Sequence, residues 1–331
     1  MEDRDLEPAP STPIVDGDPA FGTYRGACEW TRLEARERGV GRLDQWLREK
    51  HWQWFCVADG RLAVGGAIVD AGPVGTVFCW LADRTRRAIL ADASRLVPGP
   101  FLDLSETPTA GRIATRRLSR DPLTIERAGE SVRITGSAGE IGLDLRLEAA
   151  PADAVTAICP VAGGHPAACN VTQKEVTTCA SGTVTLGRRR HSFADAVGLF
   201  DYTHGLLARN TGWRWAFGVG TADGEPVGFT LVSGFNDGLE NVVWLDGERR
   251  AVGRVAHEPD PPGADGWRVT AVDGDVRVDL RLEVEAERRD ETDVGLFASS
   301  YRQPIGTWSG RLGDRSLEGV FGVAEDHRAR W

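Results

Sequence analysis

The chain has 331 residues, which suits two domains of medium size better than one small module. Its 41% of hydrophobic and 27% of charged residues are typical of a folded globular protein and exclude a mainly disordered chain. The 39 basic residues against 49 acidic ones give a net charge of −10, the wrong sign for a protein that must neutralise phosphates, so we expect no nucleic-acid partner.

Residues 1–20 contain four prolines and several acidic residues, and we expect them to be disordered or draped over the surface. This segment is acidic where a signal peptide would be basic and then apolar. No stretch of the sequence approaches the ~20 apolar residues that a membrane-spanning helix needs. We therefore expect a cytoplasmic protein without a transmembrane segment.

Between Gly26 and Lys50, leucines and tryptophans recur at helical spacing with arginines and glutamates between them, which predicts one or two short amphipathic helices. From His51 onward the period is two, as in strands, and Asp-Gly pairs separate the apolar runs, as in hairpin turns. The 40 glycines and 11 tryptophans agree with many tight turns around a tryptophan-rich interior. The pattern predicts an all-β fold with a short N-terminal helical segment.

Two short segments of the first half of the chain recur in the second half. Leu-Asp-Leu-Arg-Leu-Glu at 143–148 returns as Val-Asp-Leu-Arg-Leu-Glu at 278–283, and Trp-Gln-Trp at 52–54 returns as Trp-Arg-Trp at 213–215. These repeats predict two copies of one antiparallel β unit in tandem, each a barrel or a strongly curved sheet. The expected domains are an N-terminal barrel with a helical entry at 21–160 and a C-terminal barrel at 161–331.

Aromatic side chains of the second unit recur two residues apart, and such residues share one face of a strand. If these faces line a barrel, the second unit encloses an aromatic cavity that could hold one small apolar ligand. Glu240 would share a strand face with Trp244 and place one acid in that cavity. Alternatively, the tryptophans fill an ordinary β core and Glu240 lies at a strand end in water. The aromatic candidates for ligand binding are Trp213, Trp215, Phe217, Phe229 and Trp244.

The segment from Asp201 to Thr211 is the richest in chemically capable groups, and we expect it to be a loop just before the Trp213 strand. Asp201 could act as a general acid if burial kept it protonated, and His204 could act near neutral pH. Alternatively, Asp201 forms a structural ion pair with Arg209. Asp-x-x-His could supply two metal ligands, but no third or fourth is visible, so we expect no metal. The catalytic candidates are Asp201, Glu240 and His204.

The C-terminal part adds Tyr301, Arg302, Gln303 and His327 as candidates for binding a substrate. Glu325 and His327 lie two apart and would share a strand face, as a polar site or as a closing salt bridge. The sequence contains no G-x-S-x-G, no P-loop and no G-x-G-x-x-G before a helix, which argues against serine hydrolysis, phosphoryl transfer and hydride transfer. We therefore expect no cofactor. Without a C-x-x-C pair, the six cysteines are expected to be buried or spectator thiols.

Several short motifs stand out, mostly in the second half of the chain. They are N-x-T-Q-K at 170–174, D-x-x-x-G-x-x-x-R-x-T-x-W-x-W-A at 201–216, Gly234 with E-N at 240–241 and D-G at 246–247, S-x-x-Q-P-x-G at 300–306 and E-x-H-x-A-x-W at 325–331. This set resembles the bacterial family called domain of unknown function 2804. The resemblance runs from about Trp52 to the C-terminus, and the family's name assigns no activity.

At the level of the fold, such chains also resemble the tandem lipocalin-like proteins, which include carotenoid hydratases, tocopherol cyclases and some fungal Diels–Alder cyclases. This resemblance implies two lipocalin-like barrels side by side, with an apolar polyene or polyketide-like ligand between or inside them. It transfers no catalytic residue by motif, since a fold does not determine a function. By its position before the second tryptophan strand, Asp201 would be the counterpart of a hydratase's catalytic acid.

We therefore expect an enzyme that acts on an apolar unsaturated metabolite by adding water or closing a ring. Asp201 or Glu240 would protonate an alkene, and the tryptophan faces would stabilise cationic charge. The same cavity could also promote a pericyclic closure by its shape alone. A non-catalytic carrier of a lipid, polyene or fatty acid is the alternative. In a third hypothesis, Arg209, Arg302 and His327 anchor an acidic head group.

Overall fold

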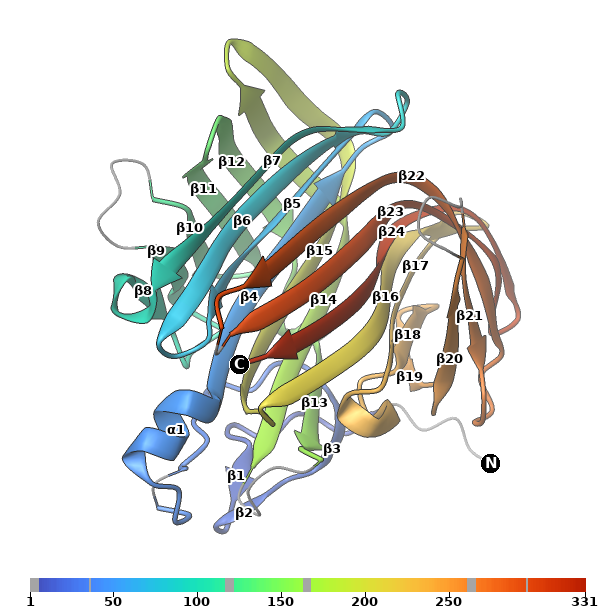
Figure 1. Cartoon of the computed structure of the whole chain (residues 1–331). Coiled ribbons are helices and arrows are strands. Elements are labelled where there is room, and N and C mark those ends of the chain that lie inside the picture. The colour runs from blue at the N-terminus through green and yellow to red at the C-terminus, as the bar shows by residue number, and fades with distance from the viewer. Residues whose placement is uncertain (1–5, 36, 117–121, 163–167, 261–265, 296) are drawn as a thin grey trace.

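The computed structural model describes residues 6–35, 37–116, 122–162, 168–260, 266–295 and 297–331. Most of these residues lie in antiparallel strands, which form two large curved sheets that pack against each other (Figure 1). The first sheet is nearly closed like a barrel and the second is a half-barrel. The all-β class and the tandem arrangement of curved sheets are therefore confirmed.

The first sheet has 13 strands, most of them joined in the order β7-β6-β5-β4-β15-β14-β12-β11-β10-β9-β8, while β13 pairs with β14 and with β3. Its strands are β3 (Gly22–Arg25), β4 (Glu49–Ala58), β5 (Leu62–Asp70), β6 (Val74–Asp83), β7 (Ala88–Pro98), β8 (Leu102–Leu104), β9 (Gly111–Arg116), β10 (Thr124–Ala128), β11 (Ser131–Ala138), β12 (Ile141–Glu148), β13 (Val155–Pro160), β14 (Cys169–Leu186) and β15 (Arg189–Leu206). Two short 3-10 turns, η1 (Gly99–Phe101) and η2 (Pro151–Asp153), lie between strands of this sheet.

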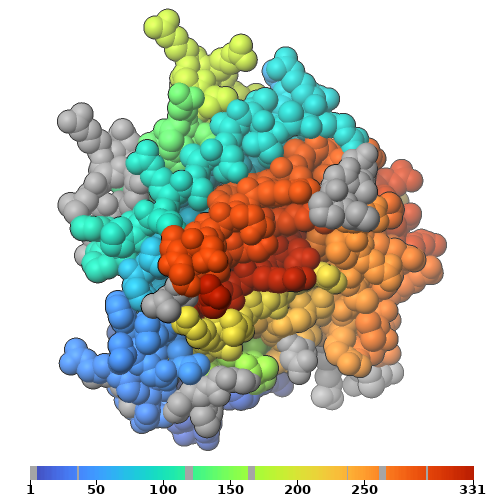
Figure 2. Space-filling model, viewed as in Figure 1, coloured from blue at the N-terminus to red at the C-terminus, as the bar shows by residue number. Residues whose placement is uncertain are grey.

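The second sheet has nine strands in the order β19-β18-β17-β16-β24-β23-β22-β21-β20. They are β16 (Asn210–Ala222), β17 (Glu225–Ser233), β18 (Val242–Leu245), β19 (Glu248–Ala251), β20 (Val255–Pro259), β21 (Gly266–Ala271), β22 (Val278–Asp293), β23 (Ala298–Leu312) and β24 (Arg315–Arg330), with the 3-10 turn η3 (Asn236–Gly238) after β17. Figure 2 shows the orange and red strands β22 to β24 filling the surface between the cyan strands of the first sheet and the yellow β16. β22 contacts both β6 and β7, so the sheets meet there as well as at β16.

The two sheets repeat the same order of strands. In each, four strands in meander order end on the Trp-x-Trp strand, β4 or β16, which pairs with the last strand of its sheet, β15 or β24. The repeated Leu-Arg-Leu segments occupy β12 and β22, which also hold equivalent places in this order. The internal repeat in the sequence therefore corresponds to a repeated unit of topology. The change of sheet lies between Leu206 and Asn210, beyond the 160/161 boundary that we expected.

The N-terminal region contains the expected short helical segment. Among the described residues one α-helix forms, α1 (Arg42–Arg48), and it starts after Gly39, whose φ of 88° interrupts a helix. Residues 14–15 and 18–19 are ordered and form a small hairpin, β1 (Ile14–Val15) with β2 (Asp18–Pro19), and the Ile14 side chain is buried against the first sheet. Residues 1–5 lie outside the described residues. Among the described residues, no helix is long and apolar enough to cross a membrane.

The core is divided into layers by the period-two alternation of the strands. Phe55 and Val57 of β4 point into the interior of the first sheet, while Trp54 and Cys56 of the same strand point toward the second sheet. A third cluster fills the concave side of the second sheet around Trp267 and Trp308. The central strands are thus buried on both faces. All six cysteines lie in the described residues and none is in a disulfide; five are buried and Cys179 is exposed.

Candidate active site

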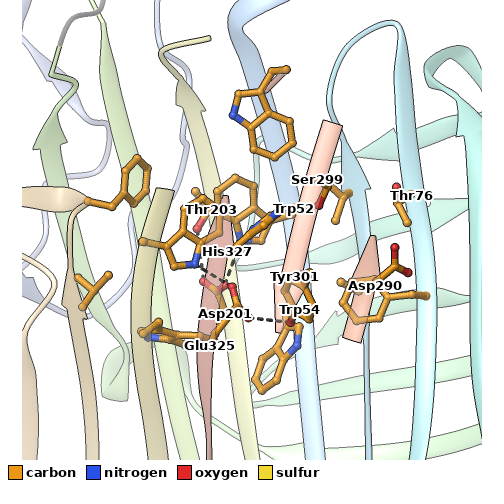
Figure 3. A pocket seen from close by; sticks show the side chains of 18 of the residues that line it. Trp52, Trp54, Thr76, Asp201, Thr203, Asp290, Ser299, Tyr301, Glu325 and His327 are labelled. Carbon is orange, nitrogen blue, oxygen red and sulfur yellow. Dashed lines mark hydrogen bonds between the residues drawn. The ribbon is translucent and has the colours of Figure 1, made fainter. Parts of the chain in front are cut away.

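A cavity of about 110 Å3 lies between the two sheets, and both sheets contribute to its wall. Half of the residues in the wall are aromatic or aliphatic, and the other half bear carboxyl, hydroxyl, amide or basic groups (Figure 3). This location, between the two units, is one of those that the fold resemblance implies, and it differs from the interior of the second unit, which the aromatic faces by themselves suggested. The reason is that the Trp213 face of β16 is turned toward the first sheet, while the opposite face of β16 lines the half-barrel.

The two Trp-x-Trp segments meet at this cavity. The rings of Trp52 and Trp213 lie nearly parallel with their centres 5.9 Å apart, and those of Trp54 and Trp215 meet edge to face at 5.4 Å. Because β4 and β16 hold equivalent places in their sheets, the cavity lies where equivalent strands of the two sheets face each other. The sequence predicts that Trp213 and Trp215 share a face, and the structure adds the matching pair from the first sheet.

Asp201 lies in the wall of the cavity and accepts several hydrogen bonds. The indole N–H of Trp52 donates to its Oδ2 at 3.0 Å, and the Lys174 ammonium lies 2.5 Å from its Oδ1. Its neighbour Thr203 lines the same wall. Asp201 belongs to the 18-residue strand β15, not to a loop, because the strand continues through the polar segment to Leu206. The expected ion pair with Arg209 does not form; the partner is Lys174.

Glu240 completes a charged cluster with Lys174 and Asp201. The Lys174 ammonium lies 3.0 Å from Glu240 Oε1, and the amide of Asn236 donates to Oε2 of the same carboxyl. Burial raises the pKa of Glu240. Burial lowers the pKa of Lys174, but the carboxyls of Asp201 and Glu240 outweigh this, so that its pKa is raised overall. The ammonium also lies 4.7 Å from the ring centre of Trp215.

Glu325 on β24 presents another carboxyl to the cavity, outside the cluster around Lys174. The indole N–H of Trp213 donates to its Oε1 at 2.7 Å, and the Tyr301 hydroxyl donates to its Oε2 at 2.7 Å. The side-chain amide of Gln303 donates to the same Oε2 at 3.1 Å. Burial raises the pKa of Glu325 to about 7, although these donors act in the opposite direction. Near neutral pH this carboxyl therefore carries a proton for a large part of the time.

His327 and Tyr301 line the cavity beside Glu325, and neither is charged at neutral pH. Burial lowers the pKa of His327 to about 3 and raises the pKa of Tyr301 well above its ordinary value. The His327 ring lies edge-on to Trp213, and its Nε2 is 2.9 Å from the Ser299 hydroxyl. Gln303 lies behind Tyr301 and supports it without lining the cavity.

His204 lies away from the cavity. Residues three apart on a strand point to opposite faces, so that β15 directs Asp201 toward the second sheet and His204 into the first. There its Nε2 is 2.8 Å from Glu49, its Nδ1 is 2.9 Å from the Thr31 carbonyl oxygen, and its ring stacks on His51. This placement contradicts a role for His204 beside Asp201.

The other aromatic candidates belong to the core. Phe217 packs against Trp215 with ring centres 5.0 Å apart, and Trp244 donates its indole N–H to the carbonyl oxygen of Asp153. Both lie in the layer between the sheets but outside the cavity wall. Phe229 points the other way, into the half-barrel, where its ring meets Trp308 edge to face at 5.5 Å. Its register on β17 decides this, because side chains two apart keep to one face.

We expect Phe229→Leu to lower the free energy of unfolding by roughly 1–2 kcal/mol, since it removes ring contacts from a filled core. Urea unfolding followed by circular dichroism measures this change. Because Phe229 is remote from the cavity, turnover by the folded variant should equal that of the unaltered protein. Loss of turnover at unchanged stability would instead place Phe229 at the ligand.

The expected anchor for an acidic head group does not assemble. Arg302 is on the opposite face of β23 from Tyr301, and it pairs with Glu287 at 2.9 Å. Arg209 donates to the carbonyl oxygen of Trp331 at 2.6 Å. Of the three residues in that hypothesis, His327 alone lines the cavity. The cations in its wall are instead Lys174 and Arg288, both already paired with carboxyl groups.

Sequence reasoning missed four functional candidates of this cavity: Trp52, Trp54, Lys174 and Arg288. It named Glu325 only together with His327, as a polar site or a closing salt bridge, and not as an acid. Signals existed for all of these residues except Arg288. The repeated Trp-x-Trp segment contains Trp52 and Trp54, and two of the motifs that carry the family resemblance end on Lys174 and begin on Glu325. We found no comparable signal for Arg288, which is one of many arginines in alternating strands.

Comparison with known proteins agrees with this architecture. Two solved structures of CghA are similar to this chain, each at 12% identity. One has a TM-score of 0.51 and covers 86% of this chain and 88% of that chain. The other, CghA with Sch210972, has a TM-score of 0.52 and covers 98% of each chain. Kievitone hydratase from Nectria haematococca has a TM-score of 0.52 at 12% identity and covers 91% of this chain and 97% of that chain. At such identity the likeness shows the fold alone.

No curated protein matches the chain by sequence. The model of the family described as "Domain of unknown function (DUF2804)" matches residues 15–331. This match spans both sheets, the cavity between them and the motifs that carry Lys174, Asp201 and Glu325. The chain therefore belongs to the DUF2804 family.

Proposed function

We propose that the protein is an enzyme that binds an apolar unsaturated small molecule between its two sheets and either adds water to it or closes a ring. Glu325 is the proton donor in this proposal. The observation that carries it is a buried carboxyl in an aromatic cavity, with a pKa that burial raises to about 7. A group with a pKa near the working pH is the most effective general acid.

The wall of the cavity suits a reaction that develops positive charge. When the Glu325 proton is transferred to one alkene carbon, the O–H bond breaks, a C–H bond forms and the other carbon becomes cationic. The rings of Trp52, Trp213 and Trp215 line the same space and can stabilise that charge by about 0.5–2 kcal/mol each. Attack by water gives the hydrated product, and attack by a second alkene of the same molecule closes a ring.

The similar solved structures support this class of chemistry by analogy. One of them is named a hydratase, and another holds the small molecule Sch210972. A non-catalytic carrier would use the same aromatic wall. A buried carboxyl that is protonated near neutral pH, in contact with the cavity, favours the enzyme over the carrier, because a carrier of apolar molecules has no use for it.

The size of the cavity limits how a substrate lies. Its volume of about 110 Å3 is below the ~300–1,000 Å3 of sites that enclose a drug-sized ligand. A groove of about 720 Å3 on the outer surface shares Trp213, Ser299 and His327 with the cavity. We infer that the reactive end of an elongated substrate enters beside these residues while the remainder lies in the groove.

Native mass spectrometry of the purified protein would show which molecule binds to it. The protein is then incubated with an apolar solvent extract of the producing cells, and the products are separated by liquid chromatography. Hydration adds the mass of one water, whereas ring closure changes retention without changing mass. Binding of an extract component with neither change would support the carrier and contradict the enzyme.

The pKa of Glu325 gives the sign of the pH dependence. Because the neutral form donates the proton, kcat/KM should fall as the pH rises through about 7. Initial rates measured across this range on the substrate identified above would test it. A rate that increases with pH through 7 would show that the charged form of Glu325 is the active one.

A further inference from the structure

The cavity contains two carboxyls in equivalent places, and each has a different neighbour on the adjacent strand. We infer that Lys174 and Gln303 decide which of these carboxyls carries the proton: Gln303 leaves Glu325 as the acid, and Lys174 keeps Asp201 as the base. This inference deepens the proposed function, on which the catalytic meaning of the pair rests, but the proton distribution itself needs no substrate. It assigns Lys174 and Gln303 as positioning residues.

The equivalence of the two carboxyls follows from strand register. Asp201 lies opposite Trp54 in the pairing of β15 with β4, and Glu325 lies opposite Trp215 in the pairing of β24 with β16. In both cases the indole N–H of the first tryptophan of the Trp-x-Trp segment donates to the carboxyl, at 3.0 Å from Trp52 and 2.7 Å from Trp213. The duplication has therefore produced the same tryptophan–carboxyl unit twice, one on each side of the cavity.

The next strand breaks this equivalence. β14 and β23 hold matching places in their sheets, and the residue that reaches the carboxyl is Lys174 in one and Gln303 in the other. The ammonium of Lys174 lies 2.5 Å from Asp201 Oδ1, and this opposite charge favours the ionised carboxyl. The Gln303 amide carries no charge, so it does not offset the effect of burial on the pKa of Glu325 as a cation would.

The orientation of the Gln303 amide is determined by its other partner. The Trp80 indole N–H, which can only donate, lies 3.0 Å from Gln303 Oε1. The amide nitrogen must therefore face Tyr301 and Glu325, to which it donates. Trp80 is completely buried, so the Gln303 amide cannot flip without leaving the Trp80 indole N–H without a hydrogen bond.

Other charged and titratable groups surround Glu325 on the neighbouring strands. On β23 the Tyr301 hydroxyl donates to it, on β15 the Asp201 charge raises its pKa, and on β14 the Lys174 charge lowers it. On β22, Arg288 lies 5.2 Å from the Tyr301 ring and is neutralised by two aspartates. Because Lys174 is in direct contact with both Asp201 and Glu240, its effect on Glu325 is secondary.

An acid and a base facing one cavity allow a complete proton cycle. In hydration, the Glu325 proton goes to an alkene carbon, a water oxygen bonds to the cationic carbon, and the proton that this water loses goes to Asp201. In ring closure, Asp201 takes the proton that the final carbocation loses when its new double bond forms. Asp201 then releases its proton to solvent and Glu325 takes one up, which restores both groups without any other reactant.

The test is a carboxyl titration of the full-length protein, labelled with carbon-13 in its Glu and Asp carboxyls and followed by NMR without substrate. We expect one glutamate signal to titrate near pH 7 and to be absent from Glu325→Gln. In Gln303→Lys, the same signal should titrate about 1–2 pH units lower, because a cation replaces the amide. The matched control Gln303→Met, which has similar length and no charge, should not move it downward.

The inference is overturned if Glu325 titrates with the exposed glutamates, or if Gln303→Lys and Gln303→Met titrate alike. Should Gln303→Lys fail to fold, as judged by circular dichroism, Lys174→Gln provides the reciprocal arm. One aspartate signal should then change its titration, and it should disappear when Asp201→Asn is added; if no aspartate signal changes, the inference is also overturned. If the carboxyls titrate as expected but the protein converts no component of the extract, the proposed function is contradicted and this inference stands.

Discussion

Glu325→Gln should reduce turnover by about 10²–10⁴-fold, the usual contribution of a positioned general acid. The amide retains the shape of the carboxyl and can still contact Trp213 and Tyr301, but it has no proton to give to an alkene. Binding of the substrate should be nearly unchanged, since the loss concerns the transition state. The measurement is kcat and KM on the substrate identified from the cell extract, with binding followed by quenching of tryptophan fluorescence.

The matched control for this variant is Glu318→Gln. Glu318 lies on the same strand, β24, is exposed to solvent and lines neither the cavity nor the groove. Its substitution makes the same chemical change on the same strand and should leave turnover within about twofold, because surface substitutions away from a site have small effects. Equal losses in both variants, or full turnover by Glu325→Gln, would remove Glu325 as the acid.

The stability of Glu325→Gln gives an independent check. The folded protein keeps this proton up to about pH 7, whereas the unfolded chain loses it near the ordinary value of 4.5. Between these values the unfolded state binds fewer protons, so the free energy of unfolding falls as the pH rises. The variant lacks this titration and should lose less stability than the unaltered protein between pH 5 and pH 7. If the variant shows this unfolding behaviour, it is folded at neutral pH, and its loss of activity does not result from unfolding.

Lys174→Met should lower the free energy of unfolding by about 3–5 kcal/mol, as expected when one partner of a buried ion pair is removed. The ammonium is 5% exposed and lies between Asp201 and Glu240, whose side chains are 6% and 4% exposed. Without it, two carboxyls are left close together in a low-dielectric layer. Because Glu240 follows η3 in the second sheet, the same change also removes a polar link between the two sheets.

Urea unfolding at neutral pH measures this effect, and a compensated variant is its control. Lys174→Met combined with Asp201→Asn and Glu240→Gln removes all three charges and should recover most of the lost stability. The slope of the urea dependence should remain similar in all three proteins, since the surface exposed on unfolding is the same. A loss below about 1 kcal/mol in the single variant, or no recovery in the triple variant, would show that the cluster is not a buried charge network.

Some features of the site could be predicted because they depend on local pattern. The period of two in residues 213–219 is sufficient to place Trp213, Trp215 and Phe217 on one face, and the structure shows that face buried in one cluster. The repeated segments likewise predicted a repeated unit, because equivalent sequences favour equivalent strands. Neither inference needed to know what the strands pack against.

The expectation that Asp201 and His204 lie together in a loop was wrong for a physical reason. Their segment contains polar residues and a glycine, which are typical of a loop, yet pairing on both sides with β4 and β14 keeps it extended. A strand that is hydrogen-bonded along both edges tolerates residues of low intrinsic strand preference. Once the segment is a strand, the odd spacing sends the two side chains to opposite faces, and they cannot form one site.

The sequence by itself determined the strand-rich class, the duplication and the pairs of residues that share a face, because each depends on neighbours along the chain. The tertiary structure alone decided that the two tryptophan faces meet each other, and therefore that the cavity lies between the sheets and not within the second. It also decided that Asp201 is buried beside a lysine while Glu325 is buried beside a neutral amide. Glu325 has its raised pKa because strands distant in sequence exclude water from it, and Asp201 has its lysine because β14 pairs beside β15.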